Sequence, residues 1–263
     1  MGIKFYKYQG AGNDFIIFDN RDKRLSTEME EWIELICDRR FGIGADGVIY
    51  FQFHPQADFE MIYFNADGKR GSMCGNGARC IVKFAKEELG EIGLKTKFIA
   101  FDGLHEAEIL EEDLIRVSMA DVNSIGMADE DYVLNTGSPH YVRMVERLDE
   151  VNVTAEGAAI RQAEPFSEDG INVNFFEVDN EQVFMRTYER GVEDETLSCG
   201  SGTVAVAISY ALKNNLPEGK HVVPITALGG NLSVQFIRGA NNSFTDIWLM
   251  GPTERVFEGF ISM

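Results

Sequence analysis

Two cysteines of this 263-residue chain have the same neighbours in sequence, since Cys74 opens Cys-Gly-Asn-Gly and Cys199 opens Cys-Gly-Ser-Gly. An apolar segment of helix length follows each motif, at 78–89 and at 203–212. A thiol at a helix N-terminus lies beside unpaired backbone N–H groups and the positive end of the helix dipole, so its pKa should fall below about 8.5. The motifs therefore predict two reactive thiols.

The glycines after each cysteine let a ligand approach the N–H groups, and a carboxylate is the ligand that such donors favour. If the two motifs face each other, one carboxylate lies between both helix ends with a thiol on each side. One thiolate then removes the proton from the neighbouring carbon, and the other thiol returns a proton to the opposite face. The pattern predicts inversion at an α-carbon, and each donor stabilises the developing charge by on the order of 3 to 4 kcal/mol.

The rest of the chain repeats with the separation of the two cysteines, 125 residues. At that offset and without a gap, the matched pairs are Gly12 and Gly137, Gly47 and Asn172, Tyr63 and Tyr188, and Asn65 and Arg190. A constant offset predicts two structurally similar domains. We expect the first to span 1–118, completed by a returning strand at 255–263, and the second to span 119–254, with the join near 119–129.

Each half is predicted to contain short strands before and after one buried helix. Apolar runs between turn residues predict strands at 4–8, 15–18, 48–53, 60–64, 97–101, 106–110 and 114–118 in the first half. In the second half they predict strands at 132–135, 141–145, 172–178, 183–188, 222–228, 232–236 and 246–250. The segment 203–212 is apolar all round, which is typical of an enclosed helix. We predict an α+β fold of two pseudo-symmetric domains, each a curved, mostly antiparallel sheet wrapped around a central helix.

A further amphipathic helix is predicted early in the chain. Ser26 or Thr27 is its expected N-cap, and Trp32, Leu35 and Ile36 form its expected apolar face. The cysteines outside the repeated motifs, Cys37 and Cys80, have apolar neighbours and are expected to be small buried hydrophobic residues.

Polar residues on the turns and strand ends are candidates for the rest of the site. His140 follows a Gly-Ser-Pro turn and Glu189 ends a strand, and we expect them to divide one proton between two similar thiols. Arg190 has the planar fork that suits a second carboxylate. The other positions expected to converge on the ligand are Asn13, Asn65, Gly75, Asn76, Asn172, Gly200 and Ser201.

Composition argues against several other classes of protein. The net charge of −19 disfavours nucleic acid, because phosphate binding needs clustered Lys and Arg. No run approaches the roughly 20 apolar residues of a membrane span, so we expect no membrane partner and a cytoplasmic protein with free thiols. A zinc site on Cys74 and Cys80 lacks a second close pair of ligands, because the four histidines are scattered.

Five stretches, two of which contain the cysteine motifs, occur in the order typical of one enzyme family. They are Gly-Ala-Gly-Asn-Asp-Phe (10–15), Phe-Gly-Ile-Gly-Ala-Asp-Gly (41–47), Phe-Asn-Ala-Asp-Gly (64–68), Cys-Gly-Asn-Gly-Ala-Arg-Cys (74–80), and Tyr-Glu-Arg-Gly (188–191) followed by Glu-Thr-Leu-Ser-Cys-Gly-Ser-Gly (195–202). In these motifs the chain resembles the diaminopimelate epimerases of the cofactor-independent amino-acid racemase group. The resemblance implies two similar domains, no pyridoxal phosphate, no metal, and conversion of LL-2,6-diaminopimelate to the meso form, for lysine and peptidoglycan precursors.

The resemblance also implies roles for the matched residues. Cys74 and Cys199 are then the acid and base, tuned by His140 and Glu189. Substrate contacts fall to Asn13, Asn65, Asn172, Glu189 and Arg190, and to the turns at Gly75-Asn76 and Gly200-Ser201. The chain departs from the family where Ser138 replaces a frequent Asn and where Gly47 replaces a Gln of some members, both near the distal end of the substrate in the resemblance.

Alternative functions stay open on the sequence alone. A relative with the same fold and another substrate is one, such as a proline racemase type or a phenazine-pathway isomerase type. Paired cysteines argue against the latter, and Glu189-Arg190 favours a substrate with a second charged end. A thiol redox or ligand-binding protein without turnover is the other. The sequence also leaves open which cysteine is the base in which direction, and whether the chain forms a homodimer.

Overall fold

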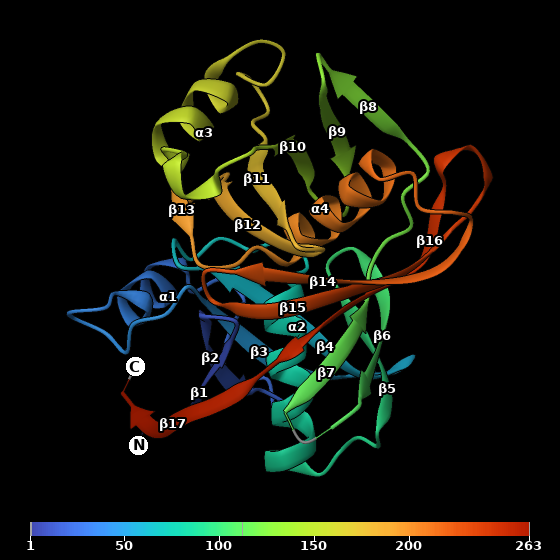
Figure 1. The fold of residues 1–263 in the computed structure, drawn as a ribbon. Coiled ribbons are helices and arrows are strands. Elements are labelled where there is room, and N and C mark those ends of the chain that lie inside the picture. Colours follow the sequence, from blue (N-terminus) through green and yellow to red (C-terminus); the bar gives the residue numbers. More distant parts are fainter. Residues whose placement is uncertain (1, 112, 263) are drawn as a thin grey trace. The chain divides into compact units, whose positions relative to one another are not determined.

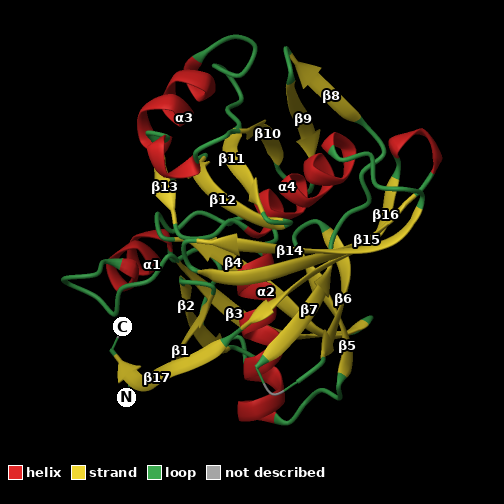
Figure 2. Cartoon of the chain, viewed as in Figure 1, coloured by secondary structure: helices red, strands yellow, loops and turns green. Residues whose placement is uncertain are grey.

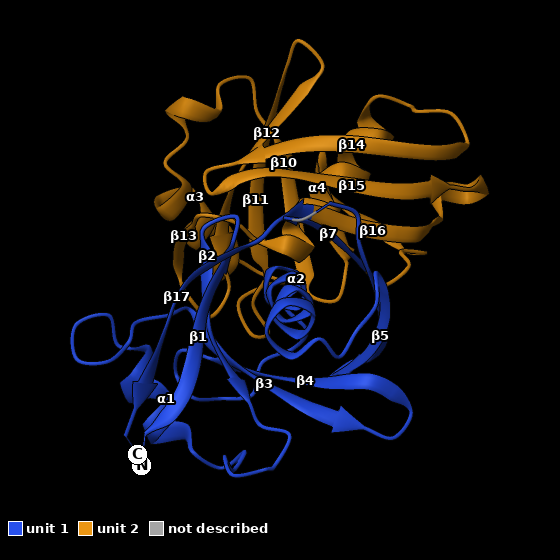
Figure 3. Ribbon diagram, turned by 90° about the horizontal axis from the view of Figure 1, so that it is seen from below, with its two compact units in different colours: residues 1–117, 251–263 blue, residues 118–250 orange. Residues whose placement is uncertain are grey.

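The computed structural model describes residues 2–111 and 113–262, and the chain divides into two compact units (Figure 3). Residues 1–117 with 251–263 form unit 1, and residues 118–250 form unit 2. Met1 and Met263, the outer ends of the predicted first domain, lie outside the described residues. Strands outnumber helices throughout (Figure 2). In the described ranges, no helix is long and apolar enough to cross a membrane.

Unit 1 is built around one mixed sheet. Its elements are β1 (Ile3–Gly10), β2 (Asn13–Asp19), α1 (Glu30–Cys37), β3 (Gly47–His54), β4 (Ala57–Asn65), α2 (Gly75–Phe84), a π-helical turn (Ala85–Leu89), β5 (Lys95–Ala100), β6 (Gly103–Ile109), β7 (Leu114–Ser118) and β17 (Glu254–Ile261). The strand order is β17-β1-β2-β3-β4-β5-β6-β7. Only β2–β3 and β4–β5 are parallel. The chain's first and last strands, β1 and β17, are thus paired neighbours (Figure 1).

Helix α2 is the centre of unit 1. All ten of its residues are buried, and it packs against β1, β2, β3, β4 and β6. In Figure 3 the helix is seen along its axis with β1, β3, β4 and β5 around it. Such enclosure removes apolar surface from water on every side, which is why this helix has no solvent-facing stripe.

The opposite face of the same sheet is covered by α1. Ile33 and Ile36 of this helix pack in one cluster with Phe18, Tyr50 and Phe64. Because β2 and β3 are buried on both faces, their sequences are continuous apolar runs rather than alternating ones.

Two details predicted for α1 are wrong. Its N-cap is Met29, without a side-chain cap, and Ser26 instead accepts a hydrogen bond from the backbone N–H of Glu28 in the preceding turn. Leu35 is 55% exposed, because the face of α1 that packs on the sheet is formed by Ile33, Ile36 and Cys37.

Unit 2 repeats this plan. Its elements are β8 (Ile125–Ala128), β9 (Asp131–Asn135), β10 (Pro139–Met144), a 3₁₀ turn (Leu148–Glu150), α3 (Val153–Gln162), β11 (Asn172–Asp179), β12 (Gln182–Glu189), β13 (Asp194–Thr196), α4 (Gly200–Lys213), β14 (Gly219–Ala227), β15 (Gly230–Arg238), a 3₁₀ turn (Ala240–Asn242) and β16 (Phe244–Pro252). The strand order is β8-β9-β10-β11-β12-β14-β15-β16, and β13 also pairs with β12. Helix α4 packs against β9, β10, β11, β12, β14 and β15.

The two units share their register as well as their topology. Phe15 pairs with Gly47 between the parallel strands β2 and β3, and 125 residues later His140 pairs with Asn172 between β10 and β11. The prediction of an α+β fold with a sheet around one helix in each half is confirmed.

Some local features differ from those predicted. Gly75-Asn76-Gly77 is the first turn of α2 rather than a turn before it, and α4 likewise starts at Gly200. The segment expected to join the domains, 119–129, contains β8, which pairs with β9 as β17 pairs with β1. The short α3 and β13 have no counterpart among the predicted elements, because neither has a strong apolar period.

Candidate active site

Each cysteine of the repeated motif is the N-cap residue of a central helix. Cys74 precedes α2 and Cys199 precedes α4, both with extended backbone. Neither helix has an acidic residue in its first turn. The N–H groups of each first turn and the positive end of the dipole therefore remain directed at the thiol and at any anion bound beside it.

In unit 1 the thiol lies beside two asparagines. Sγ of Cys74 donates to Oδ1 of Asn13 at 3.6 Å. Nδ2 of Asn76 donates to the same oxygen at 3.2 Å. The structure thus brings together Cys74, Gly75, Asn76 and Asn13, four of the residues predicted for the site.

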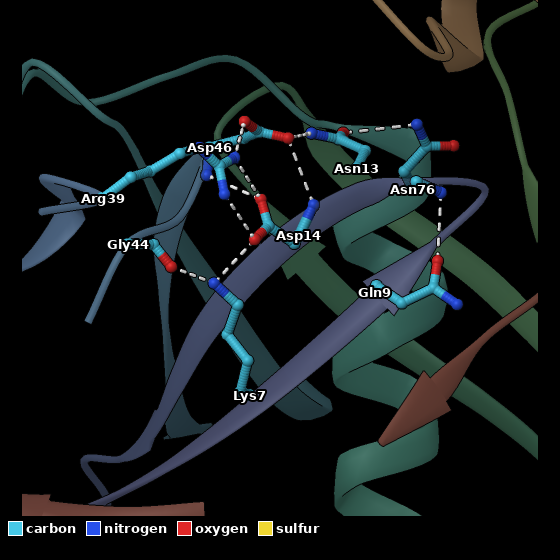
Figure 4. Close-up of polar contacts among 9 residues, drawn as sticks. Lys7, Gln9, Asn13, Asp14, Arg39, Gly44, Asp46 and Asn76 are labelled. Atoms are coloured by element: carbon cyan, nitrogen blue, oxygen red, sulfur yellow. Dashed lines mark hydrogen bonds and ion pairs between the residues drawn. The ribbon is translucent and has the colours of Figure 1, made fainter. Parts of the chain in front are cut away.

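Charged side chains behind Asn13 fix its amide (Figure 4). Nδ2 of Asn13 donates to Oδ2 of Asp46 at 2.6 Å. Arg39 donates to Asp14 and to Asp46, at 2.7 Å each. Lys7, which is buried, lies 2.7 Å from Asp14. With its NH₂ group committed to Asp46, Asn13 must present its carbonyl oxygen to Cys74.

This network also controls the ionisation of Asp14. Burial raises the pKa of this carboxyl group, but hydrogen bonds from Arg39 and Lys7 outweigh burial and lower the pKa to about 2. Asp14 is therefore ionised at neutral pH and holds both cations in place.

A buried arginine completes the site in unit 1. Arg79, on α2, is fully buried and donates to the carbonyl oxygen of Gly75 at 3.2 Å and to Oδ1 of Asn76 at 2.9 Å. Burial lowers its pKa to about 10, so it remains a cation at neutral pH. Its positive charge lies one helical turn from Cys74 and favours an anion there.

In unit 2 the thiol lies beside a serine and a histidine. Sγ of Cys199 is 3.6 Å from Oγ of Ser201, and Nε2 of His140 is 2.9 Å from the same oxygen. Thr136 donates to the carbonyl oxygen of Ser201 at 2.8 Å and holds this turn in place. Burial, and to a lesser degree the charge of Arg190, lowers the pKa of His140 to about 3, so the imidazole is neutral at physiological pH.

A second cluster of hydrogen-bonded residues in unit 2 contains Asn172, Ser138 and Arg190. Oδ1 of Asn172 accepts from the backbone N–H of Arg190 at 2.9 Å, and its Nδ2 donates to Oγ of Ser138 at 3.0 Å. Nη2 of Arg190 lies 3.5 Å from the same hydroxyl. Ser138, one of the two positions that differ from the motifs of the resembled family, thus lies between two predicted substrate contacts.

Other predicted positions have different partners. Glu189 accepts from Thr196 at 2.9 Å through Oε2. Asn65 ends β4, and its backbone closes the loop to Lys69. A Cβ atom at Gly47 would lie 2.5 Å from both the Phe64 carbonyl oxygen and the ring of Tyr63, so this position has no room for a longer side chain.

Several residues of the site escaped the sequence prediction. Asp46, Arg39 and Lys7 hold Asn13, Arg79 holds Asn76, and Asn174 contacts His140. Asp46 and Arg79 lie inside the family motifs at 41–47 and 74–80, so those motifs could have indicated that both residues belong to the site. Cys37 and Cys80 are buried, as predicted, and burial raises the pKa of each to about 12.

The arrangement within each unit suits acid–base chemistry by a thiol. A helix N-terminus offers N–H donors for a carboxylate, and the adjacent cysteine offers a proton or accepts one. In residues 2–111 and 113–262, no three side chains of the His, Cys, Asp and Glu types gather as a metal site would require.

Sequence comparison connects these features to known proteins. A sequence profile described as diaminopimelate epimerase matches residues 5–125 and 132–256. The diaminopimelate epimerase of Flavobacterium psychrophilum is 48% identical over 257 residues, covering 97% of this chain and 99% of that protein. The diaminopimelate epimerase of Aquifex aeolicus is 38% identical over 279 residues, covering 99% and 98%.

The fold recurs at much lower identity. A crystal structure of a phenazine biosynthesis protein of the PhzF family from Bacillus anthracis has a TM-score of 0.78, covers 100% of both chains and is 14% identical. At that identity the likeness concerns the two-domain fold alone.

Proposed function

Because this chain belongs to the diaminopimelate epimerase family, a family of isomerases, we propose that it converts LL-2,6-diaminopimelate to meso-2,6-diaminopimelate with Cys74 and Cys199 as the acid–base pair. The observation that carries the proposal is the position of both cysteines as N-caps of the two repeated central helices. The mechanism requires both helix N-termini to face the same α-carbon.

In this mechanism the α-carboxylate binds to the first-turn N–H groups of α2 and α4. One thiolate takes the α-proton onto Sγ, and the remaining electron pair delocalises into the carboxylate, whose negative charge the N–H groups stabilise. The other thiol gives its proton to the opposite face of the carbon. Each turnover leaves the thiol and thiolate exchanged, so the enzyme must be able to ionise either cysteine.

The surrounding residues have distinct tasks in this proposal. Asn13 and Asn76 line the Cys74 side, whereas Ser201 and His140 line the Cys199 side. Asn65, Asn172, Glu189 and Arg190 bind the distal amino-acid group, and Arg190 pairs with its carboxylate. We place the reaction in the cytoplasm, on the route to lysine and peptidoglycan precursors.

The decisive experiment incubates the protein with LL-diaminopimelate in heavy water under reducing conditions. We expect the meso isomer with deuterium at one α-carbon, detected by chiral chromatography and mass spectrometry. Deuterium exchange into proline or another amino acid, with none into diaminopimelate, would instead identify a racemase with another substrate. Thiol–disulfide cycling without any exchange would identify a redox protein and reject the proposal.

A further inference from the structure

We propose that Asn174 is a positioning residue that holds His140 in a single tautomer, so that a chain of hydrogen-bond donors through Ser201 ends on Sγ of Cys199. This inference rests on the proposed function, since it explains how the second thiol becomes a thiolate. It assigns a role to Asn174, which lies on β11 inside unit 2 and contacts His140.

The orientation of the Asn174 amide is determined by its neighbours. This side chain is fully buried, and its Nδ2 lies 3.1 Å from the backbone carbonyl oxygen of Tyr141. A carbonyl oxygen only accepts, so the atom facing it must be the NH₂ group. Oδ1 of Asn174 points the other way and accepts from Thr187 at 3.0 Å.

That orientation determines where the imidazole carries its proton. Nδ2 of Asn174 also lies 3.1 Å from Nδ1 of His140, so Nδ1 is an acceptor. The ring is buried and neutral, and a neutral imidazole has one N–H. The proton is therefore on Nε2, which donates to Oγ of Ser201 at 2.9 Å. Ser201 keeps its own hydrogen, and Sγ of Cys199, 3.6 Å away, is the acceptor it faces.

A thiolate accepts such a bond more strongly than a thiol does, because hydrogen bonds to ionised acceptors are stronger than neutral ones. The chain from Asn174 through His140 and Ser201 therefore stabilises the ionised form of Cys199. None of the three side chains in this chain of donors carries a charge, since the imidazole of His140 is neutral.

In the first half of the repeat, the thiol of Cys74 has no corresponding chain of hydrogen-bond donors through positions 15 and 49. Phe15 and Ile49 stand 125 residues before His140 and Asn174, and neither side chain has a hydrogen-bonding atom. Cys74 instead has the buried cation Arg79 on its helix, with Asp14 and Asp46 on the far side of Asn13. In unit 2 the charge of Arg190 acts on His140, and Glu189 accepts a hydrogen bond from Thr196. A buried positive charge thus lies on the helix of one thiol, and a chain of hydrogen-bond donors leads to the other.

The space around Gly202 gives independent support for a fixed position of the Asn174 side chain. A Cβ atom at this residue would lie 2.4 Å from Oδ1 of Asn174. At the corresponding Gly77, the atom nearest to an added Cβ is Cδ1 of Ile49, at 3.0 Å. The second glycine of the Cys-Gly-Ser-Gly motif therefore leaves room for the amide that orients His140.

The test uses the full chain labelled with ¹⁵N-histidine and two readouts that need no substrate. Long-range ¹H–¹⁵N spectra identify the tautomer of His140, assigned by loss of its signals in His140→Gln. Alkylation by iodoacetamide across pH, followed by mass spectrometry, compares Cys199 with Cys74 in the same molecule. We expect an Nε2–H imidazole, and we expect Asn174→Leu and Ser201→Ala to move the Cys199 profile about one pH unit upward.

Thr187→Val is the matched control, because it removes the bond to Oδ1 of Asn174 and leaves the bonds of Nδ2. It should leave the tautomer and both alkylation profiles unchanged. An Nδ1–H imidazole in the wild type overturns the inference, as does a Cys199 profile that stays in place in Ser201→Ala. Ser201→Ala keeps the test available if Asn174→Leu does not fold. The tautomer and the alkylation profiles can be as expected in a protein that leaves diaminopimelate unchanged. That result would reject the proposed function and keep the inference about Asn174.

Discussion

Asn13 and Asp46 are joined by a 2.6 Å hydrogen bond from Nδ2 to Oδ2, and this bond turns the Asn13 carbonyl toward Cys74. Asp46→Asn would let the Asn13 amide rotate, because an amide at 46 can either donate or accept. We expect kcat/KM to fall roughly 10- to 100-fold, as for small misplacements of a catalytic group. Steady-state kinetics with a circular dichroism spectrum measures this.

The exposed pair of Asp22 and Arg24 provides the control for Asp46→Asn. Asp22→Asn also removes a carboxylate from an ion pair of unit 1, and it should leave kcat/KM within about twofold of wild type. Equal losses in the two variants would show that Asp46 acts through general stability rather than through Asn13.

The two N-cap cysteines should be individually essential. Replacing either Cys74 or Cys199 by Ala removes the base in one direction and the acid in the other, so we expect at least a roughly 10³-fold loss of epimerisation in both directions. Cys37→Ala is the matched control, since its thiol is buried with Ile33 and Ile36. It should lower the free energy of unfolding and leave turnover per folded molecule unchanged. Near-native turnover in Cys74→Ala or Cys199→Ala would remove that residue from the mechanism.

The two motif glycines should differ in their tolerance of a methyl group. Gly202→Ala places Cβ 2.4 Å from a fully buried amide with several hydrogen bonds, and we expect it to cost about 1–3 kcal/mol. Gly77→Ala meets the ends of Ile49 and Met61 at 3.0 and 3.3 Å, and these flexible side chains can shift. Because alanine also favours the helix, Gly77→Ala should stay within about 1 kcal/mol of wild type. Urea unfolding of both variants measures the difference.

The neutral state of His140 predicts a dependence of stability on pH. Its pKa is about 3 in the folded chain, mainly through burial, against about 6.5 for a free histidine. Between these values the unfolded chain binds a proton that the folded chain does not. The contribution of neutral His140 to the free energy of unfolding is therefore complete above about pH 6.5, and it is lost as the pH falls toward 3.

Between about pH 6 and pH 5, the free energy of unfolding of the wild type should fall about 1 kcal/mol more than that of His140→Gln. Urea titrations at the two pH values measure both changes. Parallel dependences in the two proteins would contradict a buried, neutral His140.

The sequence by itself contained the constant offset of 125 residues, the two cysteines at helix starts, and the enclosed helix in each half. These features are local or periodic, so they can be recognised from the sequence alone. Glycine spacing indicates the helix starts, and an apolar surface on all sides indicates a buried helix. The predicted N-cap of α1 and the predicted burial of Leu35 were wrong, because the bounds of a short helix and the face that it buries depend on how it packs against the sheet.

Only the tertiary structure decided the direction of the hydrogen bonds around each thiol. His140 and Asn174 are 34 residues apart, and Asn13 and Asp46 are 33 apart; strand register brings each pair together. Whether an asparagine presents its carbonyl or its NH₂ group depends on partners such as the Tyr141 carbonyl and the Asp46 carboxylate. Composition and spacing carry no record of that choice, since it arises from atoms that meet only when the sheet closes around its helix.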